Sequence, residues 1–166
     1  MRKLLLSLLL VISIQPGGSA FAAHAFSLYD TPKYPAGFKH FDYVNPDAPR
    51  GGELYLANPD RRTSFDKFNP FSLKGVSAAG VSNLMFETLT TASSDEVATM
   101  YGLLAEDMEL APDRMSMTFR LNPKARFNNG DPVTAADVKY SYDTLLAKGA
   151  PQFKSLFADV KQCVVV

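Results

Sequence analysis

The stretch FNNGDPVTAADVKYSYDTL, residues 127–145, predicts a tight turn that leads into a well-defined helix. Gly130 permits a positive φ angle, and Pro132 presets φ for the chain that follows. Thr134 is suited to cap the helix, and Asp137 completes a capping box three residues later. Gly149 is placed to end the helix. The apolar face at helical spacing comprises Val138, Tyr142, Leu145 and Leu146. Because none of these residues is chemically reactive, the stretch predicts a scaffold.

The beginning of the chain has the pattern of a secretory signal peptide. Arg2 and Lys3 are positive, and LLLSLLLVISI (residues 4–14) is apolar but short for a membrane span. Small residues follow this run, as a cleavage site requires. An uncleaved membrane anchor is an alternative, which the short apolar run and the small residues disfavour.

Two A-x-A motifs follow one another at the predicted cleavage region. We place cleavage after Ala25, so that residues 1–25 form the signal peptide. Cleavage after Ala22 is the alternative, because the first motif ends there.

The predicted mature chain is slightly acidic. The sequence has 17 basic and 17 acidic residues, and removal of the signal takes two of the basic ones, which leaves 15. No basic stripe remains, which argues against a nucleic-acid partner. Cys163 is the only cysteine, so it can form no internal disulfide. Because no second apolar run reaches membrane-spanning length, we expect a periplasmic protein that is not membrane-embedded after cleavage.

The rest of the chain divides into short segments with different patterns. Residues 26–50 are rich in Tyr, Pro and Asp and predict an extended arm packed by aromatic side chains. MSMTFRL, residues 115–121, alternates apolar and polar residues and predicts a β-strand. The other predicted elements are a buried strand at 54–57, a helix at 76–89, a short helix or turn at 101–110, and a strand beginning in 163–166.

Sequence motifs for zinc-protease, serine-hydrolase and P-loop chemistry are absent. His40 lies among aromatic residues and makes a poor metal site alone, since a metal normally takes several ligands. Arg61 and Arg62 could hold a carboxylate through paired donors, although such loop residues are more often simply solvated. The sequence therefore predicts a protein that is not an enzyme and has no metal or cofactor, with an accessory domain of an exported enzyme as a weaker alternative.

The order of these pieces resembles a known family. LAEDMELAPDRMSMTFRLNPKARFNNGDPVTAADVKYSYDTL, residues 104–145, is similar to the signature region of the family 5 extracellular solute-binding proteins. These are the peptide-, nickel- and glycan-binding subunits of bacterial ABC importers. Asp113-Arg114 stands where the family has an Asp-Gly turn. FKHFDYVNPDAPRGGELYLA (38–57) and GAPQF (149–153) look like the subfamily associated with oligopeptide and microcin C import.

The resemblance implies a function as well as a fold. The fold would be an α/β, two-lobed type II periplasmic binding protein whose lobes close over the ligand. The protein would bind oligopeptides, including microcin C-like peptides, as a monomer, and deliver them to an inner-membrane ABC permease and its ATPase subunits. Nickel, haem or a glycan is the alternative ligand. Because family members are considerably longer, the resemblance implies an N-terminal fragment.

The resemblance also implies a division of the chain and a first binding loop. Residues 26–62 would form the N-terminal arm and first strand of lobe I, and residues 63–166 the remainder with a smaller subdomain. The loop after GGELYLAN corresponds by position to the family's first cleft loop. Its candidate ligand-binding residues are Arg62, Thr63, Ser64 and Phe65.

Overall fold

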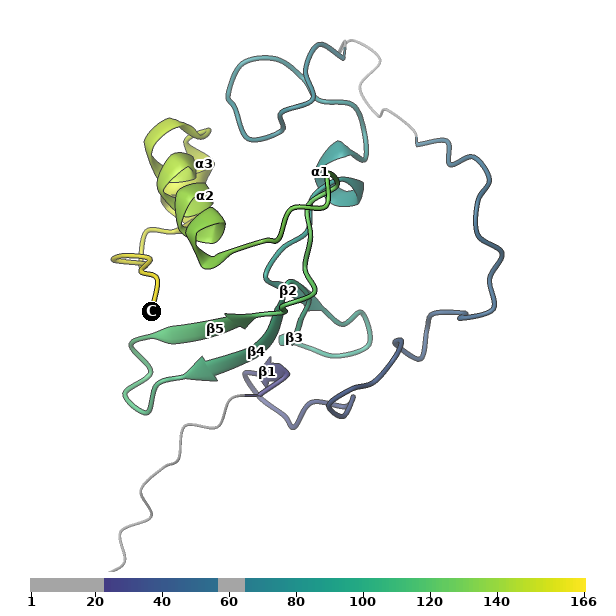
Figure 1. The fold of residues 1–166 in the computed structure, drawn as a ribbon, viewed down its shortest axis with the longest axis vertical. Helices are drawn as coiled ribbons and strands as arrows, with labels where there is room; N and C mark the ends of the chain where they lie inside the picture. Colours follow the sequence, from purple (N-terminus) through teal and green to yellow (C-terminus); the bar gives the residue numbers. More distant parts are fainter. Residues whose placement is uncertain (1–22, 57–64) are drawn as a thin grey trace, which may run out of the picture.

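The computed structural model describes residues 23–56 and 65–166. This part of the chain combines two small antiparallel sheets with three helices, and two of the helices lie together away from the strands (Figure 1). The elements in chain order are β1 (Ala25–Ser27), α1 (Val81–Leu84), β2 (Thr90–Ala92), β3 (Thr99–Gly102), β4 (Ala105–Leu110), β5 (Met117–Leu121), α2 (Ala135–Lys148) and α3 (Gln152–Leu156).

The first sheet joins the start of the described chain to a hairpin far along the sequence. Its strand order is β1-β3-β2, with both pairs antiparallel. The central strand, β3, places Tyr101 opposite Ala25 of β1 and Thr91 of β2. Tyr101 is fully buried, so the centre of this sheet is also the centre of the core.

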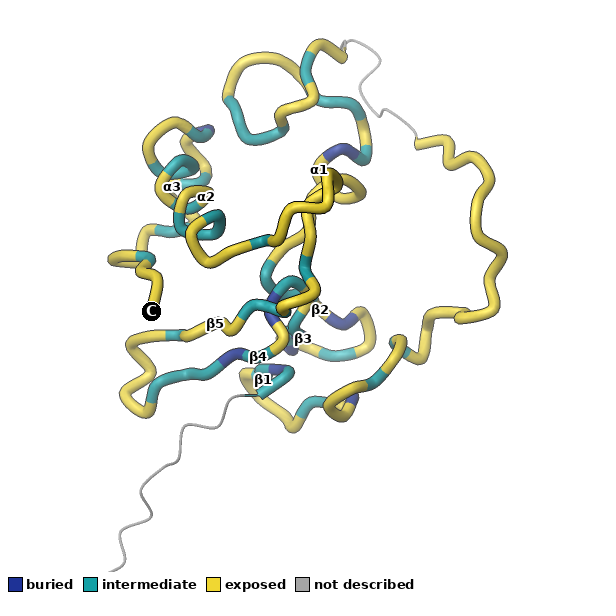
Figure 2. The backbone as a smooth tube through the Cα atoms, in the orientation of Figure 1, coloured by how far each residue is buried: buried dark blue, intermediate teal, exposed yellow. Residues whose placement is uncertain are grey.

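An aromatic cluster covers this sheet and confirms the expected packing of the arm. Tyr34 is buried, and Phe38 and Phe41 of the arm pack against it and against Tyr101. The ring centroids of Tyr34 and Tyr101 are 5.7 Å apart in an edge-to-face arrangement, a favourable geometry for aromatic pairs. Beyond this cluster the arm is mostly exposed and runs as a long arc (Figure 2).

The second sheet is the β4–β5 hairpin, and it confirms one predicted strand and corrects another prediction. β5 lies within the predicted strand at 115–121. Residues 101–110, for which we expected a short helix or turn, instead end β3 and form β4. β4 pairs with β5 from Ala105 to Leu110. Cross-strand pairing of this length outweighs the weak helical pattern, because tertiary contacts override local propensity.

The turn between these strands takes an unusual backbone conformation. Arg114 has a φ of 59°, in the left-handed region that favours glycine. The Arg114 N–H donates to the Ala111 carbonyl at 2.8 Å, and the Met115 N–H donates to Asp113 Oδ1 at 3.0 Å. The residue that replaces glycine in the family's Asp-Gly turn therefore occupies a position that requires positive φ.

The turn and capped helix agree with the sequence in detail. Gly130 has a φ of 91°. The Asp137 N–H donates to Thr134 Oγ1 at 3.3 Å, and the Thr134 N–H donates to Asp137 Oδ2 at 2.8 Å, which completes the capping box. The predicted apolar face of α2 is half-buried. On this face, the Tyr142 ring packs edge-to-face on Phe157.

Gly149 ends α2, but for a different reason from the one expected. Its φ is −69°, so no left-handed cap is present. A Cβ atom at this position would lie 2.4 Å from the Leu145 carbonyl oxygen. Glycine is therefore required here because the backbone passes so close to the end of the helix.

Three further predictions are wrong in the described residues. In place of the helix expected at 76–89, only the four-residue α1 forms. Leu89 cannot continue the helix, because its carbonyl accepts the N–H groups of Leu103 and Ala105. Residues 54–56 of the expected buried strand form no strand and are exposed, since no described segment pairs with them; Ala57 lies outside the described residues. Residues 163–166 are likewise unpaired.

Candidate ligand-binding region

The predicted cleft loop falls partly outside the described residues. Arg62, Thr63 and Ser64 belong to the segment 57–64 and lie outside the described residues. Phe65 is described, and its side chain is 52% exposed. Its ring packs edge-to-face on Phe68, with centroids 4.8 Å apart. The one predicted residue that can be placed thus presents an aromatic surface to solvent.

The residues after Phe65 form a closed loop. The Asp66 N–H donates to the Val76 carbonyl at 3.0 Å, and the Val76 N–H donates to Asp66 Oδ1 at 2.6 Å. Inside the loop, Lys67 Nζ donates to the Ser72 carbonyl at 2.6 Å. These bonds join the two ends of residues 66–76. Phe65 directly precedes this closed loop, so the chain next to it is held in place.

The same loop is attached to the end of the capped helix. The Ala150 N–H donates to the Phe71 carbonyl at 2.9 Å, and Ala150 is buried. The Phe71 ring packs on Phe86 and on Phe153, with centroids 4.9 and 6.1 Å apart. The end of α2, which the sequence predicts as scaffold, therefore supports the loop that follows the candidate ligand-binding residues.

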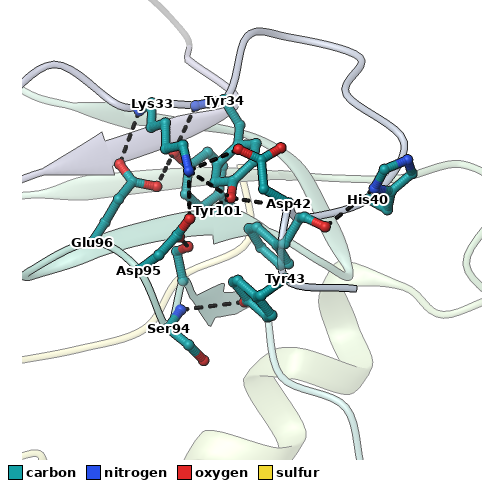
Figure 3. Close-up of polar contacts among 11 residues, drawn as sticks. Lys33, Tyr34, His40, Asp42, Tyr43, Ser94, Asp95, Glu96 and Tyr101 are labelled. Carbon is teal, nitrogen blue, oxygen red and sulfur yellow. Dashed lines mark hydrogen bonds and ion pairs between the residues drawn. The ribbon is translucent and has the colours of Figure 1, made fainter. Parts of the chain in front are cut away.

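A second group of polar side chains joins the arm to the β2–β3 loop and was not predicted. We call Lys33, Tyr34, Asp42 and Asp95 the Lys33 cluster (Figure 3). Lys33 Nζ lies 2.8 Å from Asp42 Oδ2 and 2.6 Å from Asp95 Oδ2. It also donates to the Tyr34 hydroxyl at 3.3 Å, and that hydroxyl donates to Asp95 at 2.6 Å.

The electrostatics of the Lys33 cluster follow from these contacts. The hydrogen bonds that Lys33 donates to Asp42 and Asp95 raise the pKa of Lys33. The hydrogen bond from Lys33, together with that from Ser93, holds the pKa of the Asp95 carboxyl below its usual range. Burial, followed by the hydrogen bond to Asp95, raises the pKa of Tyr34. At neutral pH the lysine is therefore cationic and the Asp95 carboxylate is anionic.

The Lys33 cluster is suited to structure and poorly suited to ligand binding. A lysine ammonium has three donors, and Asp42, Asp95 and Tyr34 accept all three. Glu96 extends the network, because it accepts from the Lys33 N–H at 2.9 Å and from the Tyr101 hydroxyl at 2.6 Å. The cluster thus fastens the arm to the loop between β2 and β3.

The remaining candidate features concern His40, metal binding and membrane crossing in the described residues. His40 is exposed, and its Nδ1 lies 3.1 Å from the Phe41 carbonyl (Figure 3). In the part of the chain that the structure describes, no three His, Cys, Asp or Glu side chains gather closely enough to hold a metal ion. Within residues 23–56 and 65–166, no helix has the length and apolar character needed to cross a membrane.

Comparison with known proteins shows similarity to one family over part of the chain. Residues 99–166, which include the β4–β5 hairpin and the capped helix, match the family described as "Bacterial extracellular solute-binding proteins, family 5 Middle". This match agrees with the resemblance of residues 104–145 to the family's signature region.

Individual relatives extend the similarity over most of the chain. The "Peptidoglycan-binding protein YepA" of Agrobacterium fabrum is 42% identical over 89% of this chain. The "Probable peptide-binding protein YejA" of the same organism is 40% identical over 80%, and the "Uncharacterized protein YejA" of Escherichia coli is 38% identical over 81%. The matches cover 25%, 21% and 22% of these relatives, so the chain spans about a quarter of their length or less.

Proposed function

We propose that the intact protein is the periplasmic substrate-binding component of an ABC importer that captures oligopeptides. The observation that carries this proposal is the family match at residues 99–166, together with a relative named as a probable peptide-binding protein. In this proposal the bound peptide passes to an inner-membrane permease with its ATPase subunits. Microcin C-like peptides belong to the proposed substrate class.

The proposed fold is the two-lobed, type II periplasmic binding protein. The mixed helices and strands of residues 23–56 and 65–166 would contribute to its first lobe, and the lobes would close over ligand about a hinge. The N-terminal arm would occupy residues 26–62, and residues 63–166 would include the smaller subdomain. The intact protein is proposed to act as a monomer.

The loop at 62–65 is the proposed contact with peptide. The support comes from the segment that follows it: residues 66–76 are closed on themselves and fixed to the end of α2. A loop held in this way can offer backbone N–H and C=O groups to an extended peptide, in the manner of strand addition. Phe65 would pack against a ligand side chain or the peptide backbone. Because recognition would act through the backbone, affinity would depend little on the side chains of the peptide.

A second candidate ligand is a fragment of peptidoglycan, in which a peptide is joined to sugar. The relative named as a peptidoglycan-binding protein favours it. Both candidates have a peptide in common, and they differ in the attached sugar. A bare tripeptide and the same peptide joined to a disaccharide therefore distinguish them.

Calorimetry on the intact exported protein tests the proposed function. We expect saturable binding of short peptides with mixed sequences, and a melting temperature that rises with peptide excess over the dissociation constant. Nickel chloride, haemin and the disaccharide-peptide serve as competing ligands. Tight binding of the disaccharide-peptide without binding of the bare peptide would favour the second candidate. Binding of nickel or haemin alone would refute the peptide assignment.

A pair of substitutions tests the proposed loop. Thr63→Pro removes a backbone N–H and fixes φ, so we expect weaker peptide binding, whereas Thr63→Ala retains the N–H and should bind normally. Phe65→Ala should also weaken binding. Leu73→Ala is its control, because Leu73 is another large apolar side chain, 70% exposed, in the following segment and outside residues 62–65. Unchanged peptide affinity in both Thr63→Pro and Phe65→Ala would remove this loop from the site.

A further inference from the structure

The three residues that precede Phe26 are hydrogen-bonded to strands of both sheets or belong to β1. The Ala23 N–H donates to the Met108 carbonyl at 2.9 Å, and the Met108 N–H donates back to the Ala23 carbonyl at 2.8 Å. This antiparallel bridge attaches Ala23 to β4. Met108 is itself buried, so both of its backbone groups depend on Ala23 for these bonds.

His24 and Ala25 are held by the first sheet and by the arm. The Gly102 N–H donates to the His24 carbonyl at 2.9 Å, and His24 Nε2 lies 2.8 Å from the Tyr34 carbonyl. Ala25 is the first residue of β1, lies opposite Tyr101, and is only 6% exposed. Residues 23–25 therefore close the gap between the two sheets and cover the aromatic core.

These contacts distinguish the two A-x-A motifs of the signal region. Cleavage after Ala25 would remove Ala23, His24 and Ala25 from the mature protein. The backbone groups of Met108 and the N–H of Gly102 would then lose their partners. Cleavage after Ala22 would retain every one of these contacts and would still follow small residues, at Ala20 and Ala22.

We propose that the cell's signal peptidase cuts between Ala22 and Ala23, so that the mature protein begins at Ala23. Water adds across the peptide bond: its oxygen enters the new Ala22 carboxylate, and the Ala23 nitrogen becomes an ammonium. An ammonium keeps N–H donors, so the new terminus still donates to the Met108 carbonyl. The mature protein would then begin with Ala23, the residue that bridges to Met108 of β4.

Processing in the cell gives the first test. The full-length precursor is expressed, and the N-terminus of the periplasmic product is determined by mass spectrometry. Pulse labelling follows conversion of the precursor in Ala22→Leu and Ala25→Leu, each of which places a large residue just before one candidate bond. We expect Ala23 as the N-terminus and precursor accumulation in Ala22→Leu alone. A Phe26 N-terminus, or precursor accumulation in Ala25→Leu alone, would overturn the proposal.

Stability of the mature protein gives a test that is independent of the protease. Two forms of the intact protein are made without a signal, one that begins at Ala23 and one that begins at Phe26, each after a removable tag. We expect a lower melting temperature and faster amide exchange at Met108 and Gly102 in the form that begins at Phe26. Equal melting temperatures and equal exchange in the two forms would show that residues 23–25 do not support the fold.

Discussion

Two regions of this chain are stabilised in opposite ways. The turn-and-helix region, residues 127–149, is fixed by contacts between near neighbours, and its capping box joins two residues three positions apart. The arm-and-sheet region, residues 23–43 with 90–102, is fixed by contacts across the chain. Its Tyr34 N–H donates to the Tyr101 hydroxyl, 67 positions away. Local chemistry can be recognised in a sequence, whereas contacts of the second kind depend on the complete fold.

The two regions also differ in how much their contacts contribute to stability. A cap or a turn residue contributes about 1 kcal/mol, because one or two hydrogen bonds or one backbone preference are involved. Burial of a large aromatic side chain in a core contributes several times as much. The region that the sequence predicts well is therefore not the region on which we expect stability to depend most.

The largest expected effect is at the centre of the arm-and-sheet region. Tyr101→Ala should lower the free energy of unfolding of the intact protein by about 3–5 kcal/mol, as for other large aromatic residues truncated in a core. Tyr101 is fully buried among Tyr34, Phe38 and Phe41, so a cavity would remain. Denaturant unfolding measures the change.

Tyr101→Phe is the matched control. It keeps the ring but removes the hydroxyl that accepts from Tyr34 and donates to Glu96. We expect a smaller loss, of about 1–3 kcal/mol, because buried polar groups lose a partner. If Tyr101→Ala cost no more than Tyr101→Phe, the aromatic cluster would not be the core of this region.

A smaller effect is expected at the helix cap. Thr134→Ala should lower the free energy of unfolding by about 1 kcal/mol, because the Asp137 N–H loses its acceptor. Thr134→Ser keeps the hydroxyl and should remain near the wild-type value. Peptide affinity should be unchanged in both variants. A loss of affinity without a loss of stability would mean that the turn-and-helix region is a binding site and not a scaffold.

The hairpin turn offers a gain in stability. Arg114→Gly should stabilise the protein by up to about 1 kcal/mol, because glycine adopts the positive φ of this position without a steric penalty, even though it is more flexible when unfolded. Arg114→Ala has the same steric problem as arginine and should bring no such gain. Equal unfolding midpoints for the glycine and alanine variants would show that the backbone is not strained here.

The sequence predicted correctly those features whose determinants are close together along the chain, and it missed those that depend on distant partners. The capping box and β5 were predicted because their determinants lie within a few residues of one another. β4 was missed because its partner strand, and not its own pattern, makes Ala105–Leu110 a strand. The helix expected at 76–89 is four residues long in the structure, because the Leu89 carbonyl accepts N–H groups from Leu103 and Ala105.

The candidate sites differ in the same way. The loop at 62–65 was found through family resemblance, and of its four residues only Phe65 is described. The Lys33 cluster has no local signal, since Lys33 and Asp95 are 62 positions apart. Its acidic and basic members look like ordinary surface charges until the fold brings them together.

The smallest expected effect concerns the ion pair of the Lys33 cluster, and it tests whether long-range polar contacts matter as the aromatic ones do. The pKa of Asp95 is lower in the folded protein than its ordinary value of 3.8, mainly because Lys33 donates to it. A carboxylate with a depressed folded pKa stabilises the protein fully above its unfolded pKa. That contribution is lost as the pH falls through the folded pKa. The difference in stability between wild type and Asp95→Asn should therefore be small and constant near neutral pH, and should shrink below about pH 4. Lys33 is about half exposed, so added salt should weaken the effect. Urea unfolding from pH 7 to pH 2 measures it, and Lys33→Met with the double variant isolates the pair. If Asp95→Asn changed stability equally at pH 7 and pH 2, the carboxylate would act through its shape and hydrogen bonds, and its charge would contribute nothing to holding the arm on the sheet.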